Sequence, residues 1–315
     1  MIPAFPQFKK VEVSDRQDVE AHTHTYDPYS DFNFTSLWAW DTSEERMISE
    51  LNGNLVVRFT DYSTHEPFLS FLGSNETEHT ARTLIDYFKA EGLPTTLRLM
   101  PEVSVRGMRP SVLRVEEDRD NFDYVYSIAK LATLRGGEYM SKRGRANKFR
   151  RECPDVIVES VDLADTDAQS SILRVVDVWE KKKINDAKKY EIEHERIAIM
   201  RLCETAHSHE LVATAIFLHR EMLAFSIDEI LPNEYSICHF WKADTSRAGA
   251  FDFLMQEKAK HLETFGVQYI NYEQDLGTHA LRTAKSSYRP THFLKKYMVC
   301  FALAVYNEDN GNGGK

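Results

Sequence analysis

The order of strand and helix signals constrains the fold of this chain more than any other feature of its sequence. In the first half, apolar strand patterns at 54–60 and 67–72 precede a helical pattern at 76–91 and a strand at 96–100. In the second half, strand patterns at 211–218, 222–231 and 234–240 precede a helix at 249–265 and a strand that begins at 267. Two antiparallel meanders, each followed by a helix and a further strand, predict an α/β (α+β) fold. It would have two similar domains, each a mixed, mainly antiparallel sheet flanked by helices.

The chain has 315 residues, a length at which single domains usually give way to two. We place the boundary near residue 163, so that the expected domains cover 1–163 and 164–306. The last strand is expected at 293–304. The tail at 307–315 is too polar and glycine-rich to pack, so we expect it to be disordered. We expect the first domain to be a scaffold and the second to carry the chemistry.

Composition excludes several classes of function. The net charge of −10 argues against a protein that coats nucleic acid, because such binding requires many phosphates to be neutralised. No apolar run approaches the roughly 18 residues of a spanning helix, and residues 1–10 lack the apolar core of a signal peptide. The four cysteines lie far apart, and no histidine pair has an obvious third ligand. We therefore expect reduced thiols, no bound metal and a cytoplasmic protein.

The segment 271–290 combines acidic and basic groups in an order that is typical of an active site. Glu273 and Asp275 follow an apolar strand, and the short helix after them presents three basic residues on one edge: Arg282, Lys285 and Arg289. Acid groups and a cationic rim at a strand end suit a reaction that moves a proton on an anionic substrate. The alternative is a helix whose basic face is simply solvated.

A second candidate region is the basic helix expected at 138–152. Its apolar stripe contains Lys142 as well as Tyr139, Ala146, Phe149 and Cys153. A lysine on a core-facing stripe must extend its amine to the surface or find an anion, so Lys142 is a candidate for substrate binding. Arg143 and Asn147 lie one turn apart on the adjacent edge, where they could contact the same ligand. The alternative is again a solvated helix face.

Four stretches of the sequence resemble motifs of the phosphatidylglycerol lysyltransferase C-terminal domain family, the catalytic domain of lysyl-phosphatidylglycerol synthases. The late segment reads Asn-x-Glu-x-Asp-Leu-Gly at 271–277 and Leu-Arg-x-x-Lys-x-x-Tyr-x-Pro at 281–290. Residues 30–40 resemble the N-terminal signature of the family, and residues 139–149 resemble its Tyr-x-x-Lys-Arg-x-x-x-Asn-Lys-Phe helix. Residues 241–244 resemble its Glu-Lys-Ala-Asp/Asn segment, with Trp241 in place of the acidic residue. The matches cover nearly the whole chain.

The resemblance implies two GNAT-like acyltransferase domains in tandem and an aminoacyl-tRNA as the donor. The CoA-binding loop usual in GNAT proteins, Gln/Arg-x-x-Gly-x-Gly/Ala, does not fit residues 244–250, which agrees with such a donor. We therefore expect an aminoacyltransferase that moves an amino acid from aminoacyl-tRNA to an amine or hydroxyl of a soluble acceptor. We expect no cofactor and no stable membrane association. The alternatives are an acyl-CoA-dependent GNAT N-acyltransferase and a non-catalytic ligand-binding protein that kept the fold.

Each candidate residue has an expected role in this transfer. Asp275 is expected to orient or deprotonate the acceptor, with Glu273 as the second candidate. Arg282 and Lys285 are candidates to bind the terminal phosphates or the oxyanion, and Tyr288 to hydrogen-bond the leaving group. The alternative for Tyr288 is packing in the core. The substrate-binding candidates are Asp244, for the α-ammonium of the donor, and Lys142, Arg143, Asn147, Asn271 and Arg289.

Overall fold

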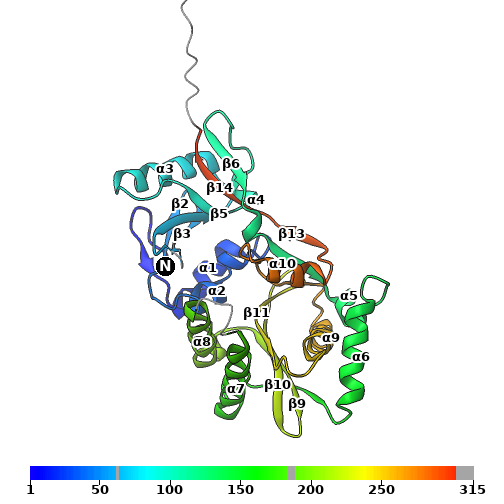
Figure 1. The fold of residues 1–315 in the computed structure, drawn as a ribbon. Coiled ribbons are helices and arrows are strands. Elements are labelled where there is room, and N and C mark those ends of the chain that lie inside the picture. The colour runs from blue at the N-terminus through cyan, green and yellow to red at the C-terminus, as the bar shows by residue number, and fades with distance from the viewer. Residues whose placement is uncertain (62–63, 184–188, 303–315) are drawn as a thin grey trace, which may run out of the picture.

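The computed structural model describes residues 1–61, 64–183 and 189–302 (Figure 1). Within these residues the strands form three sheets, one large and two small. The tail at 307–315, which was predicted to be disordered, lies outside the described residues. Figure 1 shows the small sheets at one end of the molecule, the large sheet at the other end, and α10 (His279–Ser286) between them.

The first small sheet is antiparallel and has the order β1-β2-β3-β4 in the described chain. Its strands are β1 (Lys9–Lys10), β2 (Met47–Leu51), β3 (Asn54–Thr60) and β4 (Pro67–Leu72). The helices near it in sequence are α1 (Arg16–Thr23), α2 (Phe34–Ala39) and α3 (Thr77–Ala90). Leu84, Ile85 and Phe88 form the apolar face of α3 and share a buried cluster with Val56 and Phe71 of the sheet.

The second small sheet joins distant parts of the chain. Its antiparallel strands have the order β5-β14-β6, and they are β5 (Leu97–Pro101), β6 (Leu113–Glu117) and β14 (Lys296–Phe301). The short helix α4 (Glu102–Val105) follows β5. Val299 of β14 lies in the same buried cluster as Leu97 and Met100 of β5. The last described strand therefore completes the core of the first part of the chain.

The large sheet has the order β13-β7-β12-β11-β10-β9-β8 within the described residues. Its strands are β7 (Asp123–Ser127), β8 (Ile157–Val161), β9 (Leu211–Leu218), β10 (Glu221–Ile230), β11 (Tyr235–Ala243), β12 (Tyr269–Asn271) and β13 (His292–Leu294). In the described chain β11 and β12 run parallel, and the other neighbours in this sheet are antiparallel. The parallel pair follows from α9 (Ala250–Glu263), which returns the chain to the same edge.

Helices cover both faces of the large sheet (Figure 1). On one face, α7 (Thr166–Lys183) and α8 (Lys189–Glu204) supply Ile172 and Ile199 to a cluster with Phe225 and Phe240. On the other face α9 packs against the strands, and α5 (Ile128–Thr133) and α6 (Met140–Glu152) lie beside α9.

The contact between α6 and the start of α9 is close. Gly249 is the N-cap of α9 with φ of 91°, and a Cβ at this position would lie 2.4 Å from the carbonyl oxygen of Arg145. The Arg145 guanidinium also donates two hydrogen bonds to Asp252 in the first turn of α9, with N···O distances of 2.6 and 3.0 Å. Helix α6 therefore covers the N-terminal end of α9.

The predicted fold class, a mixed α/β architecture of mainly antiparallel sheets flanked by helices, is confirmed. The single strand expected at 293–304 is wrong, because the chain there forms β13 and β14 in two different sheets. The domain boundary near residue 163 stays a prediction. Strand pairing crosses it, since β7 pairs with β12 and β8 pairs with β9.

Candidate active site

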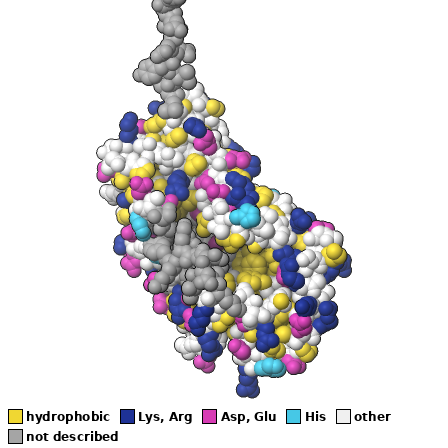
Figure 2. Space-filling model, in the orientation of Figure 1, with side chains coloured by type: hydrophobic (Ala, Val, Ile, Leu, Met, Phe, Trp, Pro, Cys, Tyr) yellow, Lys and Arg dark blue, Asp and Glu magenta, His cyan; other side chains and the backbone are white. Residues whose placement is uncertain are grey.

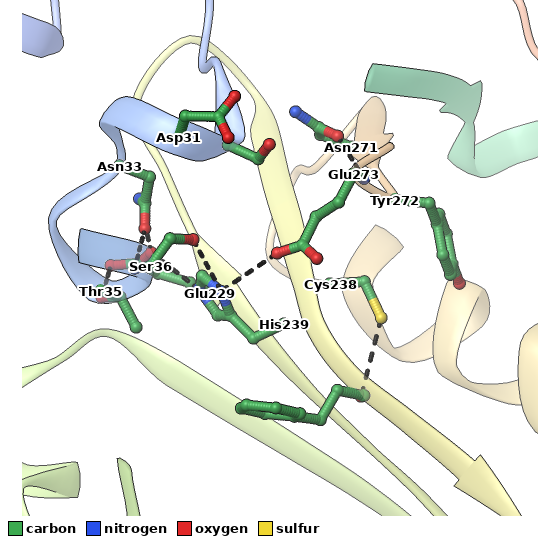
Figure 3. A network of polar contacts seen from close by, with 12 residues as sticks. Asp31, Asn33, Thr35, Ser36, Glu229, Cys238, His239, Asn271, Tyr272 and Glu273 are labelled. Carbon is green, nitrogen blue, oxygen red and sulfur yellow. Dashed lines mark hydrogen bonds and ion pairs between the residues drawn. The ribbon is translucent and has the colours of Figure 1, made fainter. Parts of the chain in front are cut away.

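The candidate active site lies where β11 and β12 separate. The two strands pair over 235–237 and 269–271, after which β12 ends and β11 continues to Ala243. Just past this point the register between β10 and β11 shifts, and His239 is left without a residue opposite it. Such a β-bulge re-aims the extra side chain, and bulges of this kind occur beside active sites. Figure 3 shows the His239 ring lying between Glu229 and Glu273.

Glu273 is the carboxyl group that faces open space at this point. The chain turns there with φ of 57°, and the side chain, which is 22% exposed, lines a cavity of about 470 Å³. Burial raises the pKa of Glu273 to about 7, although His239 and Lys285 act in the opposite direction. A carboxyl group with this pKa exchanges a proton near neutral pH, as a general base or acid must.

Glu229 and His239 form a buried pair behind Glu273. The two side chains are 1% and 0% exposed, and His239 Nε2 lies 3.1 Å from Glu229 Oε2. Glu229 also accepts hydrogen bonds from Asn33 and Thr35 of the α2 region at 2.8 and 2.7 Å. Burial alone would raise the pKa of Glu229, but its hydrogen bonds outweigh burial and lower it. On its other side, His239 Nδ1 lies 3.9 Å from Glu273 Oε1 and 3.4 Å from Ser36 Oγ.

The cavity lies between the first small sheet and the chain that follows β12. Its lining includes aromatic rings of Trp40, Phe59 and Phe68. Carboxylates outnumber cations in that lining, with Asp31, Asp61, Asp118, Asp120 and Glu273 against Arg46 and Arg98. Three of these carboxylates are paired with cations, Asp31 with Lys296, Asp61 with Arg98 and Asp120 with Arg282, so most of the negative charge in the lining is neutralised within the protein.

A second buried cluster ties the cavity wall to both ends of the chain. Lys296 of β14 is fully buried, pairs with Asp31 and lies 2.7 Å from Asp123 of β7. Asp123 also accepts hydrogen bonds from Ser30 and Asn271. Burial lowers the pKa of Lys296, but its two carboxylates outweigh burial and raise it. Asn271, predicted to bind substrate, is buried and holds the backbone of this cluster through the Pro28 carbonyl.

Asp275, the predicted first candidate for the base, lies in a saturated hydrogen-bond network. Its side chain is 0% exposed and accepts hydrogen bonds from Tyr124 at 2.6 Å and from Arg282 at 2.9 Å to each oxygen. Arg119 lies 3.3 Å away. Burial would raise the pKa of Asp275, but these hydrogen bonds lower it. The geometry favours a structural role, in which Asp275 fastens α10 to β7.

Arg282 and Lys285 are also engaged within the protein. Arg282 binds Asp275 and also donates to Asp120 at 2.6 Å, while its side chain stays 37% exposed. The Lys285 amine donates to the carbonyl oxygens of Tyr272 and Gln274 at 2.5 and 2.6 Å, and burial lowers its pKa. Lys285 therefore holds the loop that carries Glu273 in place.

Tyr288 and Lys142 meet each other around Asp252. The Tyr288 hydroxyl donates to Asp252 at 2.6 Å, and the ring is 5% exposed within a core cluster. The Lys142 amine lies 3.8 Å from the centre of that ring and 3.8 Å from Asp252. Burial lowers the pKa of Lys142 and raises that of Tyr288. The structure thus brings these two predicted site residues together, but away from the residues that line the cavity.

The remaining predicted residues are dispersed. Arg143 donates to the carbonyl oxygens of Leu134 and Gly136, and Asn147 and Arg289 are exposed. Asp244 accepts hydrogen bonds from Ser246 at 2.8 and 2.7 Å. Figure 2, in the orientation of Figure 1, shows Lys and Arg side chains spread over the visible part of the surface near α6 and α9. In the described part of the chain, no group of three or more His, Cys, Asp or Glu side chains is arranged to hold a metal ion.

A sequence profile described as phosphatidylglycerol lysyltransferase, C-terminal, matches residues 23–300. The chain belongs to this family. Its structure is similar to that of a conserved protein of unknown function from Bacteroides thetaiotaomicron, with 27% identity, a TM-score of 0.82 and coverage of 96% of this chain and 100% of the other. The predicted resemblance is confirmed.

Two further relatives of this lysyltransferase family member are more distant. The C-terminal domain of a putative lysylphosphatidylglycerol synthetase from Agrobacterium fabrum has the same fold, with 12% identity, a TM-score of 0.63 and coverage of 91% and 90% of the two chains. An uncharacterised protein of Mycoplasmoides gallisepticum is 22% identical over 191 residues, or 59% of this chain. The chain spans 57% of the length of that curated relative. No helix among the described residues of this family member combines the length and apolar character needed to span a bilayer.

Sequence reasoning missed Glu229, His239 and Asp31 of this family member. One signal was present, since Asp228 and Glu229 lie together in an otherwise apolar strand. Two adjacent acids in a buried strand require partners, and the structure provides them on opposite faces. Asp228 pairs with Lys258 at 2.7 Å on the α9 side.

Proposed function

We propose that this protein is an aminoacyltransferase that moves an amino acid from aminoacyl-tRNA to an amine or hydroxyl of a soluble acceptor. The proton-transfer step of this proposal rests on Glu273, a carboxyl group with a pKa of about 7 that lines the cavity and lies beside His239. The donor rests on the family, whose resemblance implies aminoacyl-tRNA, and the family name itself states a lysyl transfer.

Glu273 takes the part of the general base in this proposal. The acceptor nitrogen or oxygen attacks the ester carbonyl carbon of the donor, and Glu273 accepts the proton that the nucleophile releases. The bond between the carbonyl carbon and the ribose oxygen then breaks. Glu273 returns the proton to that oxygen, so that the carboxylate is regenerated.

The N-terminal end of α9 argues against the acyl-CoA alternative. In a CoA-dependent member of the GNAT superfamily this helix start would have to receive a pyrophosphate, which needs free backbone N–H groups and room for backbone approach. Here α6 covers it, with Gly249 against the Arg145 carbonyl and Asp252 bound to Arg145. A carboxylate already occupies the first turn of the helix. We therefore expect calorimetry to detect no binding of CoA.

The deciding experiment mixes the full chain with a total tRNA pool charged with labelled amino acids. We expect one amino acid to leave its tRNA faster than in buffer, and to appear on a small molecule or peptide when cell extract is added. Glu273→Gln should lose this transfer. Tight binding of charged tRNA without any transfer would favour a non-catalytic protein that kept the fold.

We propose a soluble acceptor and a cytoplasmic site of action. The net charge of −10 is repelled by anionic headgroups, and basic patches contribute on the order of 1 kcal/mol per Lys or Arg at a membrane surface. Sedimentation with anionic liposomes at physiological salt should leave the protein in the supernatant. Formation of aminoacylated phosphatidylglycerol from charged tRNA and lipid would contradict this part of the proposal.

A further inference from the structure

The bulge in β11 gives His239 contacts on both sides of its ring. Its Nε2 atom lies 3.1 Å from the Glu229 carboxylate, and its Nδ1 atom points toward Glu273, 3.9 Å away (Figure 3). The Glu229 carboxylate is itself fixed, because Asn33 and Thr35 each donate a hydrogen bond to one of its two oxygens. The imidazole is thus held in one orientation by a buried anion, with its Nδ1 edge toward Glu273 and Ser36.

We propose that His239, oriented by Glu229, is the positioning residue that receives from Glu273 the proton taken from the acceptor. In this step the two side chains close from 3.9 Å to hydrogen-bond distance, the O–H bond of the Glu273 carboxyl breaks and an N–H bond forms at His239 Nδ1. The imidazolium that results faces the Glu229 carboxylate through its Nε2–H group. The step reverses when the ribose oxygen leaves and needs a proton. The inference rests on the proposed function for the origin of the proton, which comes from the acceptor. The coupling between Glu273 and His239 is independent of that function.

The groups that surround Glu273 affect its ionisation in opposite directions. Charged or titratable groups on four elements act on Glu273: Asp31 from the 3-10 turn Ser30–Phe32, Asp123 from β7, Lys285 from α10, and His239 and Cys238 from β11. The two aspartates oppose ionisation of Glu273, whereas Lys285 favours it, and His239 favours it when the imidazole carries a proton. The Lys285 amine donates to two backbone carbonyls of the loop that carries Glu273. His239 is the neighbour with an acceptor atom directed at Glu273.

The test measures the pKa of Glu273 directly, by carbon-13 NMR of the full chain labelled in its glutamate carboxyl groups. The Glu273 signal is assigned as the one missing from Glu273→Gln. Once His239 holds the shared proton, its positive charge opposes protonation of Glu273; His239→Gln removes this charge and should raise the pKa of Glu273 by about one unit, the lower end of what an opposite charge nearby produces. Glu229→Gln should shift it in the same direction and serves as the second variant if His239→Gln does not fold.

The pH profile of transfer separates this role from simple structural support. In both variants the midpoint of turnover against pH should move upward with the Glu273 pKa, so that activity lost at pH 7 returns at higher pH. His209→Gln is the matched control, because His209 is another buried histidine that contacts Thr35 but not Glu273. We expect it to leave the Glu273 pKa and the midpoint unchanged, whatever it does to stability.

Two outcomes distinguish failure of this inference from failure of the proposed function. A folded His239→Gln protein whose Glu273 pKa and pH midpoint equal those of the wild type would overturn the inference. Absence of transfer from any charged tRNA, together with the expected shift in the NMR titration, would overturn the proposed donor and still support the coupling of His239 to Glu273.

Discussion

Glu273 and Asp275 are two residues apart, yet their environments move the pKa values of the two carboxyl groups in opposite directions. Burial beside the cavity raises that of Glu273, and hydrogen bonds from Arg282 and Tyr124 lower that of Asp275. Pairs of titratable groups that are pushed apart in this way separate a proton-transfer role from a structural one.

Glu273→Gln should lower turnover by roughly a hundredfold or more, because the amide cannot accept a proton. It should also raise stability at alkaline pH. The folded protein holds the Glu273 proton up to a pH of about 7, whereas the unfolded chain loses it near 4.5, so the free energy of unfolding falls as pH rises between these values. The variant lacks this loss and should gain up to about 3 kcal/mol at pH 8. Urea titrations at pH 8 and pH 4 measure this, and an equal effect at both values would contradict it.

Asp275→Asn should mainly destabilise the protein. It removes a buried hydrogen-bond acceptor from Tyr124, Arg282 and Arg119, and because both guanidiniums are more than a third exposed the loss should be about 1–3 kcal/mol. Because the pKa of Asp275 is lowered on folding, its stabilisation is present above the unfolded value of 3.8 and is lost as pH falls through the folded value. Thermal melts of wild type and variant should therefore converge toward low pH. A variant with unchanged melting temperature and lost turnover would instead return Asp275 to the chemistry.

The residues of the candidate site differ in how far they could be predicted. Glu273 was predicted, as the second candidate after Asp275, because it follows a strand in the local sequence. The partners of Glu273 were not, because His239 reaches it through a one-residue register shift in β11 and Glu229 lies on β10. The register shift leaves no local signal, and the adjacent acids Asp228 and Glu229 indicate only that each needs a partner, not which partner it has. The same limit applies to Lys142, whose partner Asp252 lies on another helix.

The close junction of α6 with α9 depends on a glycine at the start of α9. Gly249→Ala would place a Cβ 2.4 Å from the backbone of Arg145 at a φ of 91°, so the helices must move apart. We expect a loss of about 1–3 kcal/mol in the free energy of unfolding. Gly92→Ala is a matched control, because it has a φ of 69° but nothing within 4 Å of the added carbon. Chemical denaturation measures both, and equal losses would show that backbone strain alone is responsible.

The order of elements was largely predictable, since periodicity marks strands and helices wherever one face is buried. The sheet that each half of the last apolar segment joins was not predictable. Apolar residues at 293–294 and 297–301 flank Lys295 and Lys296, and two lysines are compatible with one continuous strand, so the pattern does not specify that β13 and β14 join different sheets. Lys296 starts β14 with its amine on Asp31 and Asp123, and these partners come from distant parts of the chain.

The exposed cations of α6 are the groups that we expect to contact the phosphates of tRNA. Lys142 and Arg143 have partners inside the protein, whereas Lys148 and Arg151 are exposed. Lys148→Ala with Arg151→Ala should weaken tRNA binding and reduce the slope of log affinity against log salt by about 1.5 to 2. Arg82→Ala with Lys89→Ala, which removes two exposed cations from α3, is the control. Equal slopes in wild type and the α6 double variant would show that α6 does not contact phosphates.

The return of β14 to the first part of the chain also has a consequence for synthesis on the ribosome. Strands β5 and β6 are complete once residue 117 has been made, but β14, which lies between them, is not made until residue 301. Until then their inner edges have no partner strand, and unpaired edges invite association with other chains. A nascent chain stalled before residue 296 should therefore need chaperone protection at this sheet, although the seven strands of the large sheet in the described chain have already been translated.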